Sequence, residues 1–556
     1  MSVITNPVLR GFNPDPSIIR VGDDYYIATS TFEWFPGVQI HHSKDLIHWE
    51  LIYRPLDRLS QLNMKGVPDS CGVWAPCLSY DQGIFYLVYS IVKSFAGVWK
   101  DTPNYLVTAN HINGPWSDPV FLNASGFDGS LFHDEDGKKW YISMLVDHRG
   151  NKMFGGVILQ EFDPGLQKLV GKTFHIFGGS SLGLTEGPHL YGKDNYYYLI
   201  TAEGGTEYGH AATVARSKDI KGPYEISPVH PFISSRQSKD YYLQKTGHAD
   251  LVQATNGEWL AVFLSARPLS PRGLCILGRE TSIEMVNWRK DGWPELANTY
   301  NLPRSQVPLN GMAHKKAEEI SKSLDTRSVT DHFDGKELNI HFQSLRIPVT
   351  EQWASLKQRP GFLTLKGRES LTSTHEQSLI ARRMQSLKME ASAAVDFKPD
   401  NFQQMAGLVC YYNTAHFHYL HISATDNGKR CLQIITHDHF DQSETFEIPV
   451  PLPDNGMIFL KAALNGIHMQ FFYAIEEGVW IQAGSLLNAG ILSDDYIREG
   501  GTRYRPAFTG AFVGICCQDL TGNFHPAFFD WFRYEEGEYE FASSIKNEMQ
   551  CEKSGL

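Results

Sequence analysis

A short hairpin pattern recurs five times in the first half of this 556-residue chain, and it limits the folds that are open to the chain. Each copy contains a polar or small residue, two apolar residues, a turn of Gly, Asp or Asn, and an aromatic-rich strand. The copies begin at Asp15, Ala75, Asp128, Glu186 and His248, between 53 and 62 residues apart. Most are followed by a second hairpin, and two hairpins make the four strands of a propeller blade. The repeat therefore predicts a five-bladed β-propeller, with a chance series of hairpins in a β-sandwich as the alternative.

The repeat stops near residue 300, and the remaining chain predicts a second all-β domain. Short strand-like segments separated by turns continue there without a blade-length period, which favours a β-sandwich of jelly-roll or concanavalin-like type. We expect a propeller over residues 1–300, a linker with one short helix over 301–328, the sandwich over 329–545 and a loose tail over 546–556. The predicted fold class is thus all-β.

Composition excludes several classes of partner. The chain has 62 acidic against 50 basic residues, a formal charge of −12, whereas binding to nucleic acid or to an anionic membrane needs a basic surface. No run of apolar residues is long enough for a membrane span, and the N-terminal residues do not resemble a signal peptide, so we expect a cytoplasmic protein. The eight cysteines form no CxxC pair, which predicts free thiols rather than a zinc site or a disulfide framework.

A propeller would bring reactive side chains of distant segments together, because equivalent positions of successive blades surround a common channel. Three carboxylates, Asp15, Asp128 and Glu186, and the imidazole of His248 are expected to converge there. Crowded carboxylates repel one another and raise each other's pKa, so such clusters serve function more often than packing. Glycoside hydrolysis needs one carboxyl group as acid and another as base or nucleophile, and a third can tune the acid. A non-catalytic sugar-binding propeller is the alternative from another class.

Several ordered motifs carry a resemblance to a known family. In the first domain they are Gly11–Ser17, Tyr25–Gly37, Val73–Pro76, Gly126–Asp134, Thr185–Leu190 and Gly278–Thr281, and in the second they are Phe402–Asn413 and Phe508–Gly514. Together these motifs resemble glycoside hydrolase family 43, and within it the two-domain β-xylosidases, over nearly the whole chain. The resemblance implies a propeller followed by a sandwich, in agreement with the repeat.

The resemblance also implies an inverting mechanism with a role for each matching residue. Asp15 resembles the general base that activates water, Glu186 the general acid, and Asp128 the third acid, which orients Glu186 and tunes its pKa. Arg279 resembles an arginine that binds sugar hydroxyls, with a salt bridge to a nearby acid as the alternative. The residues that resemble pocket walls are Phe32, Trp74, Phe127, His248 and, from the second domain, Phe508.

The activity that this resemblance implies is the release of single xylose units from the non-reducing ends of β-1,4-xylo-oligosaccharides. An α-L-arabinofuranosidase, or an enzyme with both activities, stays open as the alternative. No cofactor is required, and the only metal that relatives suggest is calcium in the channel, reached by His248 through water. Two acidic runs, Asp134–Asp136 and Thr436–Asp441, are interpreted as a solvated turn and a polar loop. Relatives also suggest a homodimer or homotetramer.

Overall fold

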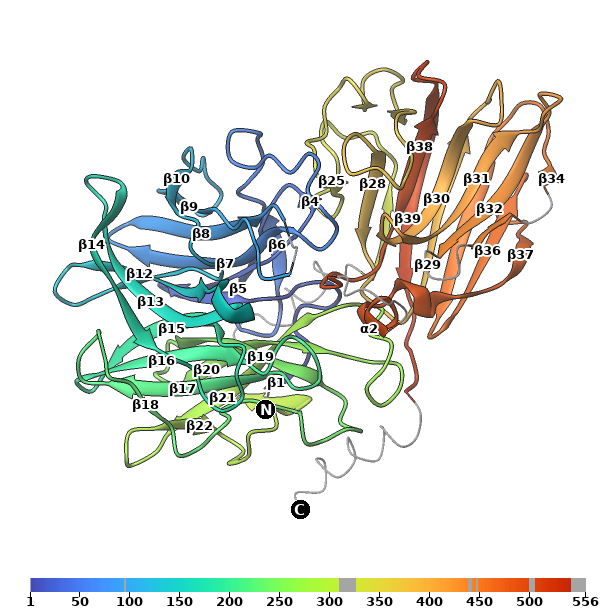
Figure 1. Ribbon diagram of the computed structural model, residues 1–556. Coiled ribbons are helices and arrows are strands. Elements are labelled where there is room, and N and C mark those ends of the chain that lie inside the picture. The colour runs from blue at the N-terminus through green and yellow to red at the C-terminus, as the bar shows by residue number, and fades with distance from the viewer. Residues whose placement is uncertain are drawn as a thin grey trace.

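The chain folds into two all-β domains that pack side by side, as the computed structural model in Figure 1 shows. The structure describes residues 2–94, 97–309, 327–438, 443–446, 449–499 and 506–541. The helix expected in the linker, the C-terminal tail and residues 439–441 of the Thr436–Asp441 run lie outside the described residues. Thr436–Asp438, which the sequence assigns to a polar loop, instead form the end of strand β32 (Arg430–Asp438), paired on both sides. In Figure 1 the first domain runs from blue to green and the second from yellow to red. Among the described residues, no helix is long and apolar enough to cross a membrane.

The first domain is a five-bladed β-propeller, as the repeat predicts. Each blade is a four-stranded antiparallel sheet whose strands follow one another in chain order. The blades are β2 (Ser17–Val21), β3 (Asp24–Thr29), β5 (Gln39–Ser43) and β6 (Glu50–Tyr53); β7 (Gly72–Asp81), β8 (Ile84–Val92), β9 (Asn104–Ala109) and β10 (Val120–Asn123); β11 (Ser130–His133), β12 (Lys139–Val146), β13 (Phe154–Asp163) and β14 (Lys168–Phe177); β15 (Glu186–Lys193), β16 (Tyr196–Glu203), β17 (Ala211–Ser217) and β18 (Glu225–Ile226); and β19 (Gln244–Gln253), β20 (Trp259–Ala266), β21 (Glu280–Trp288) and β22 (Pro294–Leu296).

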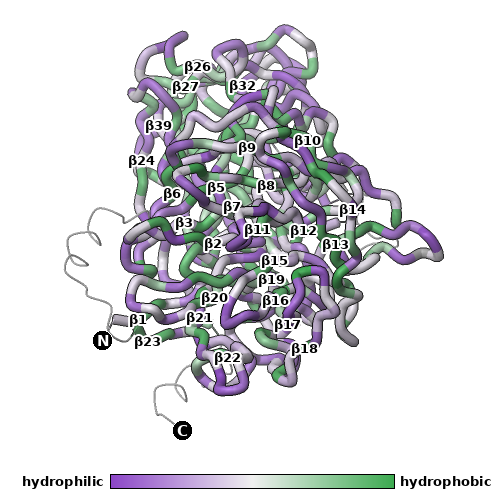
Figure 2. The backbone as a smooth tube through the Cα atoms, turned by 90° about the vertical axis from the view of Figure 1, so that its left-hand side faces the viewer, coloured by the Kyte–Doolittle hydropathy of each residue, from purple (hydrophilic) through white to green (hydrophobic). Residues whose placement is uncertain are grey.

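The first strand of each blade lies innermost. Strands β2, β7, β11, β15 and β19 contact one another in a ring, and their labels gather in the middle of Figure 2. A separate apolar cluster fills each gap between neighbouring blades, since the aromatic and β-branched residues of the hairpins face the adjoining sheet. This packing explains why one hairpin pattern, repeated five times, is sufficient to specify the ring.

A short sheet outside the blades closes the ring. β1 (Ser2–Thr5) pairs with β23 (Gln306–Leu309), and the side-chain amide of Asn6 donates to the carbonyl of Ile283 at 2.7 Å. β23 therefore lies inside the segment 301–328, which the sequence assigns to a linker. Its partner strand among the described residues is β1, about 300 residues earlier in the chain, so a pattern search within the segment itself does not find it.

The second domain is a sandwich of two antiparallel sheets around one apolar core. One sheet contains β24 (Ser328–Asp331), β26 (Ala354–Ser355), β27 (Leu363–Lys366), β29 (Lys388–Asp396), β35 (Ile458–Asn465), β36 (His468–Ala474), β37 (Ile481–Asn488) and β39 (Pro526–Glu536). The other contains β28 (Ser378–Arg383), β30 (Gln404–Asn413), β31 (His416–Ala424), β32 (Arg430–Asp438), β33 (Ser443–Phe446), β34 (Val450–Pro451) and β38 (Phe512–Asp519).

The sandwich is fixed against the first two blades. β4 (Trp34–Phe35) of the propeller pairs with β25 (Ser344–Leu345) of the second domain. The ring of Trp34 stacks on Phe512 with centroids 3.7 Å apart, and one apolar cluster continues across the boundary. Six residues form the short helix α2 (Asp494–Glu499), which lies where the two domains meet (Figure 1). Phe508, which comes after α2 in the chain, can therefore reach the mouth of the propeller.

Candidate active site

One residue at the start of each blade has a left-handed backbone. These residues are Asp15, Ala75, Asp128, Gly187 and His248, with φ between 34° and 55°. The sequence predicts Glu186 as the fourth member of this set, but the structure places Gly187 there. Glu186 takes the preceding position, which Trp74 and Phe127 occupy in the second and third blades. The acidic residues at the channel mouth therefore come from two successive positions of the repeat.

All nine residues predicted for the site line a single pocket of about 310 Å³ at the mouth of the propeller. The members of this set are Asp15, Phe32, Trp74, Phe127, Asp128, Glu186, His248, Arg279 and Phe508. Eight of them come from the propeller, whereas Phe508 comes from the sandwich. Its backbone N–H donates to the hydroxyl of Ser70 at 3.1 Å, which ties this segment to the propeller. The pocket is thus complete only when both domains are in place.

Asp15 is buried but surrounded by donors. An Nη1 of Arg279 donates to its Oδ1 at 2.8 Å, and the hydroxyl of Ser30 donates to its Oδ2 at 2.7 Å. Burial opposes the charged form, yet the Arg279 guanidinium and these contacts outweigh it and lower the pKa of Asp15. Asp15 is therefore a carboxylate at neutral pH. His248 lies close by, with Nδ1 3.7 Å from Asp15 Oδ1, and burial lowers its own pKa to about 4, so its imidazole is neutral.

The pKa values of Glu186 and Asp128 are raised, in contrast to that of Asp15. Burial and the negative charge of Asp15 raise the pKa of Glu186 to about 8. Burial, with the charges of Glu186 and Asp15, raises the pKa of Asp128 well above its usual value, although the N–H of Gly187 donates to its Oδ2 at 3.1 Å. One pocket thus holds an ionised carboxylate next to a carboxyl group that keeps its proton at neutral pH. That contrast is what a paired acid and base require.

Arg279 contacts two other residues of the pocket. Besides the salt bridge to Asp15, its Nη2 donates to the carbonyl of Phe508 at 3.1 Å. The structure therefore shows the salt bridge that the sequence left open as the alternative reading of Arg279. Its buried Nε has no partner among the described residues, which leaves one N–H of the guanidinium for a bound molecule.

Four aromatic rings form a continuous wall. Trp74 lies 5.7 Å from Phe32, 5.4 Å from Phe127 and 5.5 Å from Phe508, measured between ring centroids. Aromatic faces of this kind pack against the apolar C–H surface of a sugar ring. The wall joins residues from two blades, the loop before blade three and the sandwich.

Sequence reasoning misses several further residues of the pocket. Arg498 of α2 forms an ion pair with Glu207 and lies with its guanidinium carbon 4.7 Å from the ring centre of Phe508. Lys100 also lines the pocket, and partial burial lowers its pKa to about 8. The remaining missed members are Met153, Phe154, Leu184, Gly204, Gly205 and Thr206. None of them belongs to the repeated positions, so the repeat carries no signal for them.

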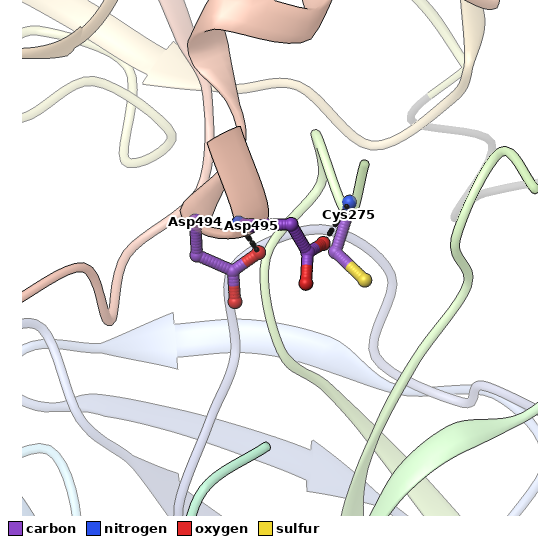
Figure 3. Close-up of side chains that lie close together, drawn as sticks. All are labelled: Cys275, Asp494 and Asp495. Carbon is purple, nitrogen blue, oxygen red and sulfur yellow. Dashed lines mark hydrogen bonds between the residues drawn. The ribbon is translucent and has the colours of Figure 1, made fainter. Parts of the chain in front are cut away.

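A buried ion cluster anchors α2 to the propeller. The ammonium of Lys245, which is wholly buried, lies 3.0 Å from Asp494 and 2.9 Å from Asp495. The N–H of Cys275 donates to Asp495 at 2.7 Å, and Figure 3 shows this bond across the boundary. This contact holds the helix that carries Arg498 next to the pocket.

The side chains of Cys275, Asp494 and Asp495 also form a group that has the donor atoms of a metal site, within 4.8 Å of one another. Two observations argue for an ion pair instead. The Lys245 ammonium already supplies the positive charge at this place. Burial raises the pKa of the Cys275 thiol well above its usual value, and a thiol that keeps its proton is a poor ligand.

The described residues of the channel below the pocket do not form a cluster of metal ligands. One channel carboxylate, Asp250, accepts from the hydroxyls of Ser17 and Tyr191 and from the N–H groups of Ile18 and Leu251. Within the described residues, no three ligand atoms of the channel lie close together. A calcium ion held only through water by His248 stays a prediction.

The raised pKa of Glu186 has a consequence for stability. In the unfolded chain Glu186 ionises near its ordinary pKa of 4.5, whereas in the folded chain it keeps its proton up to about 8. Stability is therefore lost as the pH rises between these values, by up to a few kcal/mol since one pKa unit is about 1.4 kcal/mol. We expect Glu186→Gln to reduce this loss, so that its melting temperature exceeds that of the parent at pH 8 more than at pH 5. Calorimetric scans at both values check it; a parallel shift at the two pH values contradicts it.

Enzymes that cut glycosidic bonds use two carboxyl groups in opposite protonation states. The contrast between Asp15 and Glu186, inside a pocket walled by aromatic rings, is therefore the signature of a glycoside hydrolase.

Comparisons with known proteins give the family. Residues 4–294 match the family model described as glycosyl hydrolases family 43, and residues 330–535 match the β-xylosidase C-terminal concanavalin A-like domain. The chain belongs to glycosyl hydrolase family 43. It is 50% identical over 543 residues to a protein of Bacillus subtilis named β-xylosidase, covering 96% of this chain and 99% of that protein.

Two further relatives agree with this assignment. A protein of Humicola insolens named xylosidase/arabinosidase 43B is 47% identical over 539 residues, covering 96% of this chain and 98% of that protein. The crystal structure of a xylan β-1,4-xylosidase from Bacillus halodurans superposes with a TM-score of 0.90 at 49% identity, covering 96% of this chain and 100% of that one. The second domain is thus of the concanavalin-like type that the sequence predicts.

Proposed function

We propose that this protein is an exo-acting, inverting β-xylosidase that releases xylose from the non-reducing ends of β-1,4-xylo-oligosaccharides. The observation that carries the proposal is the contrast in one pocket between Asp15, whose pKa is lowered, and Glu186, whose pKa is raised to about 8. Phe508 from the sandwich walls this pocket on one side, which favours a chain end over the middle of a chain. The names of relatives at 47% to 50% identity support xylose as the sugar.

The proposed reaction is a single displacement. The Asp15 carboxylate takes a proton from a water molecule while the water oxygen forms a bond to the anomeric carbon. The bond between that carbon and the glycosidic oxygen breaks, and Glu186 donates its proton to the departing oxygen. Asp15 ends protonated and Glu186 ends ionised, and exchange with solvent restores both. No step uses a cofactor or a metal ion.

The neighbouring residues have supporting roles in this proposal. The Arg279 guanidinium keeps Asp15 ionised and offers its Nε–H to a sugar hydroxyl. Asp128, whose own pKa is also raised, accepts from the N–H of Gly187, the residue that follows the acid, and so helps to position Glu186. The rings of Phe32, Trp74, Phe127 and Phe508 pack against the sugar, with His248 beside the base.

Substrate comparison tests the function. Hydrolysis of 4-nitrophenyl β-D-xyloside and of 4-nitrophenyl α-L-arabinofuranoside at equal concentration is expected to favour the xyloside. A larger kcat/KM for the arabinofuranoside would contradict the proposal and identify the protein as an α-L-arabinofuranosidase. The name of the Humicola insolens relative, xylosidase/arabinosidase 43B, is the reason to test this alternative. Calorimetry that detects xylobiose binding without turnover supports a non-catalytic sugar-binding propeller instead.

The cytoplasmic location and the dimeric or tetrameric state remain predictions from the sequence. Light scattering of the purified full-length chain checks the second of these, because a dimer or tetramer has two or four times the 62.8 kDa mass of the chain.

A further inference from the structure

A second cavity, of about 460 Å³, lies between blade one of the propeller and the sandwich. It is lined by segments that are far apart in the chain, from the region around Arg10, from blade one, from the start of the second domain and from the end of β28. None of its residues belongs to the predicted site. It shares no lining residue with the active-site pocket.

The charge of this cavity is strongly positive. Among the described residues, four arginines line it, Arg10, Arg54, Arg382 and Arg383, against a single carboxylate, the exposed Glu50. Arg10 is paired with Glu536, and the charge of Glu536 also reaches Arg382. No carboxylate is paired with Arg54 or Arg383 among the described residues, and these two guanidinium groups repel each other.

Several N–H groups of this cavity have no hydrogen-bond partner among the residues that the structure describes. Arg54, Arg382 and Arg383 are each more than nine-tenths buried, at 7%, 3% and 6% exposure. Within that part of the chain, the Nε of Arg54, the Nε of Arg382 and the Nη2 of Arg383 make no hydrogen bond, and neither does the Nδ1 of the equally buried His41. Buried donors without partners are costly, and buried charges are normally paired.

The other nitrogens of the same arginines are held firmly, so the free groups are fixed in place. Arg54 donates through Nη2 to the side-chain oxygen of Gln39 at 2.9 Å and through Nη1 to the carbonyl of Ile340. Arg383 donates through Nε to the carbonyl of Phe12 at 2.6 Å and also binds the side chain of Gln343. Such an arrangement is preorganised for a ligand, because its donors need not be ordered on binding.

We propose that this cavity binds a small oxyanion of phosphate size, held by Arg54, Arg382 and Arg383 at the boundary of the two domains. A phosphate or carboxylate group accepts in the planar, forked geometry that guanidinium groups offer. It also supplies the negative charge that the site lacks. Burial alone lowers the pKa of Arg54 to about 9, and the same three arginines with burial lower the pKa of His341 to about 3. A bound anion reverses both effects.

The site is linked to the active site through one chain of bonds. The Gln39 amide, which Arg54 contacts, donates to the side-chain oxygen of Asn13 at 2.7 Å. Asn13 is two residues before Asp15, and its N–H donates to the carbonyl of Arg279 at 2.9 Å. The anion therefore lies where it braces the segment that carries the base, although its binding does not depend on the proposed function.

Calorimetric titration with inorganic phosphate tests the proposal on the full-length chain, in a buffer without other polyvalent anions. The expected result is saturable binding of one phosphate per chain, with a melting temperature that rises with phosphate concentration. Added xylose is expected to leave the titration unchanged, because the two cavities are separate. The absence of saturable binding of phosphate, and of sulfate and succinate tested in parallel, overturns the proposal. Comparison of the three anions identifies whether a tetrahedral or a carboxylate ligand fits better.

Variants locate the site. Arg383→Met and Arg54→Met are each expected to weaken phosphate binding roughly 10- to 100-fold, as loss of one charge-assisted hydrogen-bonding group implies. Arg289→Met is the matched control, since Arg289 is exposed and pairs with Asp291 on the propeller surface. Undiminished binding in both cavity variants places the anion elsewhere and overturns the assignment. If either variant fails to fold, an anomalous-scattering peak of selenate between Arg54 and Arg383 in crystals of the parent supports the site, and its absence at saturating selenate contradicts it.

Discussion

Replacement of either proposed proton-transfer residue is expected to abolish most of the xylobiose hydrolysis. General acid–base catalysis contributes about 10²–10⁴-fold, so Asp15→Ala and Glu186→Ala should each lower kcat by at least that factor. Both side chains are buried in the pocket, at 5% and 8% exposure, so their effect is not one of surface charge. Steady-state rates of released xylose provide the measurement, with circular dichroism as the check on folding.

The activities of the two variants should depend differently on the leaving group of the substrate. A 4-nitrophenolate departs without a proton, whereas a sugar hydroxyl needs one. Glu186→Ala is therefore expected to lose far less activity on the aryl xyloside than on xylobiose. Asp15→Ala is expected to lose a similar fraction of its activity on both substrates. Asp136→Asn, at an exposed turn of the third blade, is the matched control and should be fully active. Equal losses of Glu186→Ala on the two substrates would remove Glu186 from the role of acid.

Loss of the Lys245 ammonium is expected to have the largest effect on stability. The side chain is wholly buried between Asp494, Asp495 and Glu207, and it joins the fifth blade to α2. Removing one partner from a buried ion pair leaves uncompensated charge and costs about 3–5 kcal/mol. Lys245→Met should therefore lower the free energy of unfolding by that amount, and Lys290→Met, at an exposed position, should leave it unchanged.

The same variant has a pH signature. Burial, with the charge of Asp495, already raises the pKa of Asp494 to about 7 against the lowering effect of Lys245. Without the ammonium this pKa rises further, so protonation relieves the repulsion as the pH falls. The deficit of Lys245→Met should be smaller at pH 5 than at pH 8. Because α2 carries Arg498 beside Phe508, KM should also rise, and a variant with parental stability and KM would refute the anchoring role.

The sequence predicts the structural features that recur from blade to blade. The hairpin pattern predicts five blades, and because blades share an axis it also predicts that Asp15, Asp128, Glu186 and His248 converge, as they do in one pocket. The register of the fourth copy differs by one residue, since Gly187 takes the left-handed position and Glu186 precedes it. Motif resemblance adds Arg279 and Phe508, which no repeat indicates, and the comparisons agree with the family that those motifs suggest.

Features that depend on contacts between distant segments escape such reasoning. Arg498 and Glu207 meet only because α2 docks on the propeller, and β23 is a strand only because β1 pairs with it. The cationic cavity likewise unites Arg54 with Arg382 and Arg383, more than 300 residues later in the chain. In each case the local sequence gives no signal, because the contact joins segments that are far apart in the chain.

The central claim is a single displacement with Asp15 as base and Glu186 as acid, and the configuration of the released sugar tests it most directly. Proton NMR of xylobiose hydrolysis in the first minutes distinguishes the two anomers before mutarotation mixes them. The account predicts that α-xylose appears first from the β-linked substrate, because water attacks from the face opposite to the leaving group. Initial release of β-xylose would mean a double displacement through a covalent intermediate, and it would contradict the mechanism proposed for this pocket.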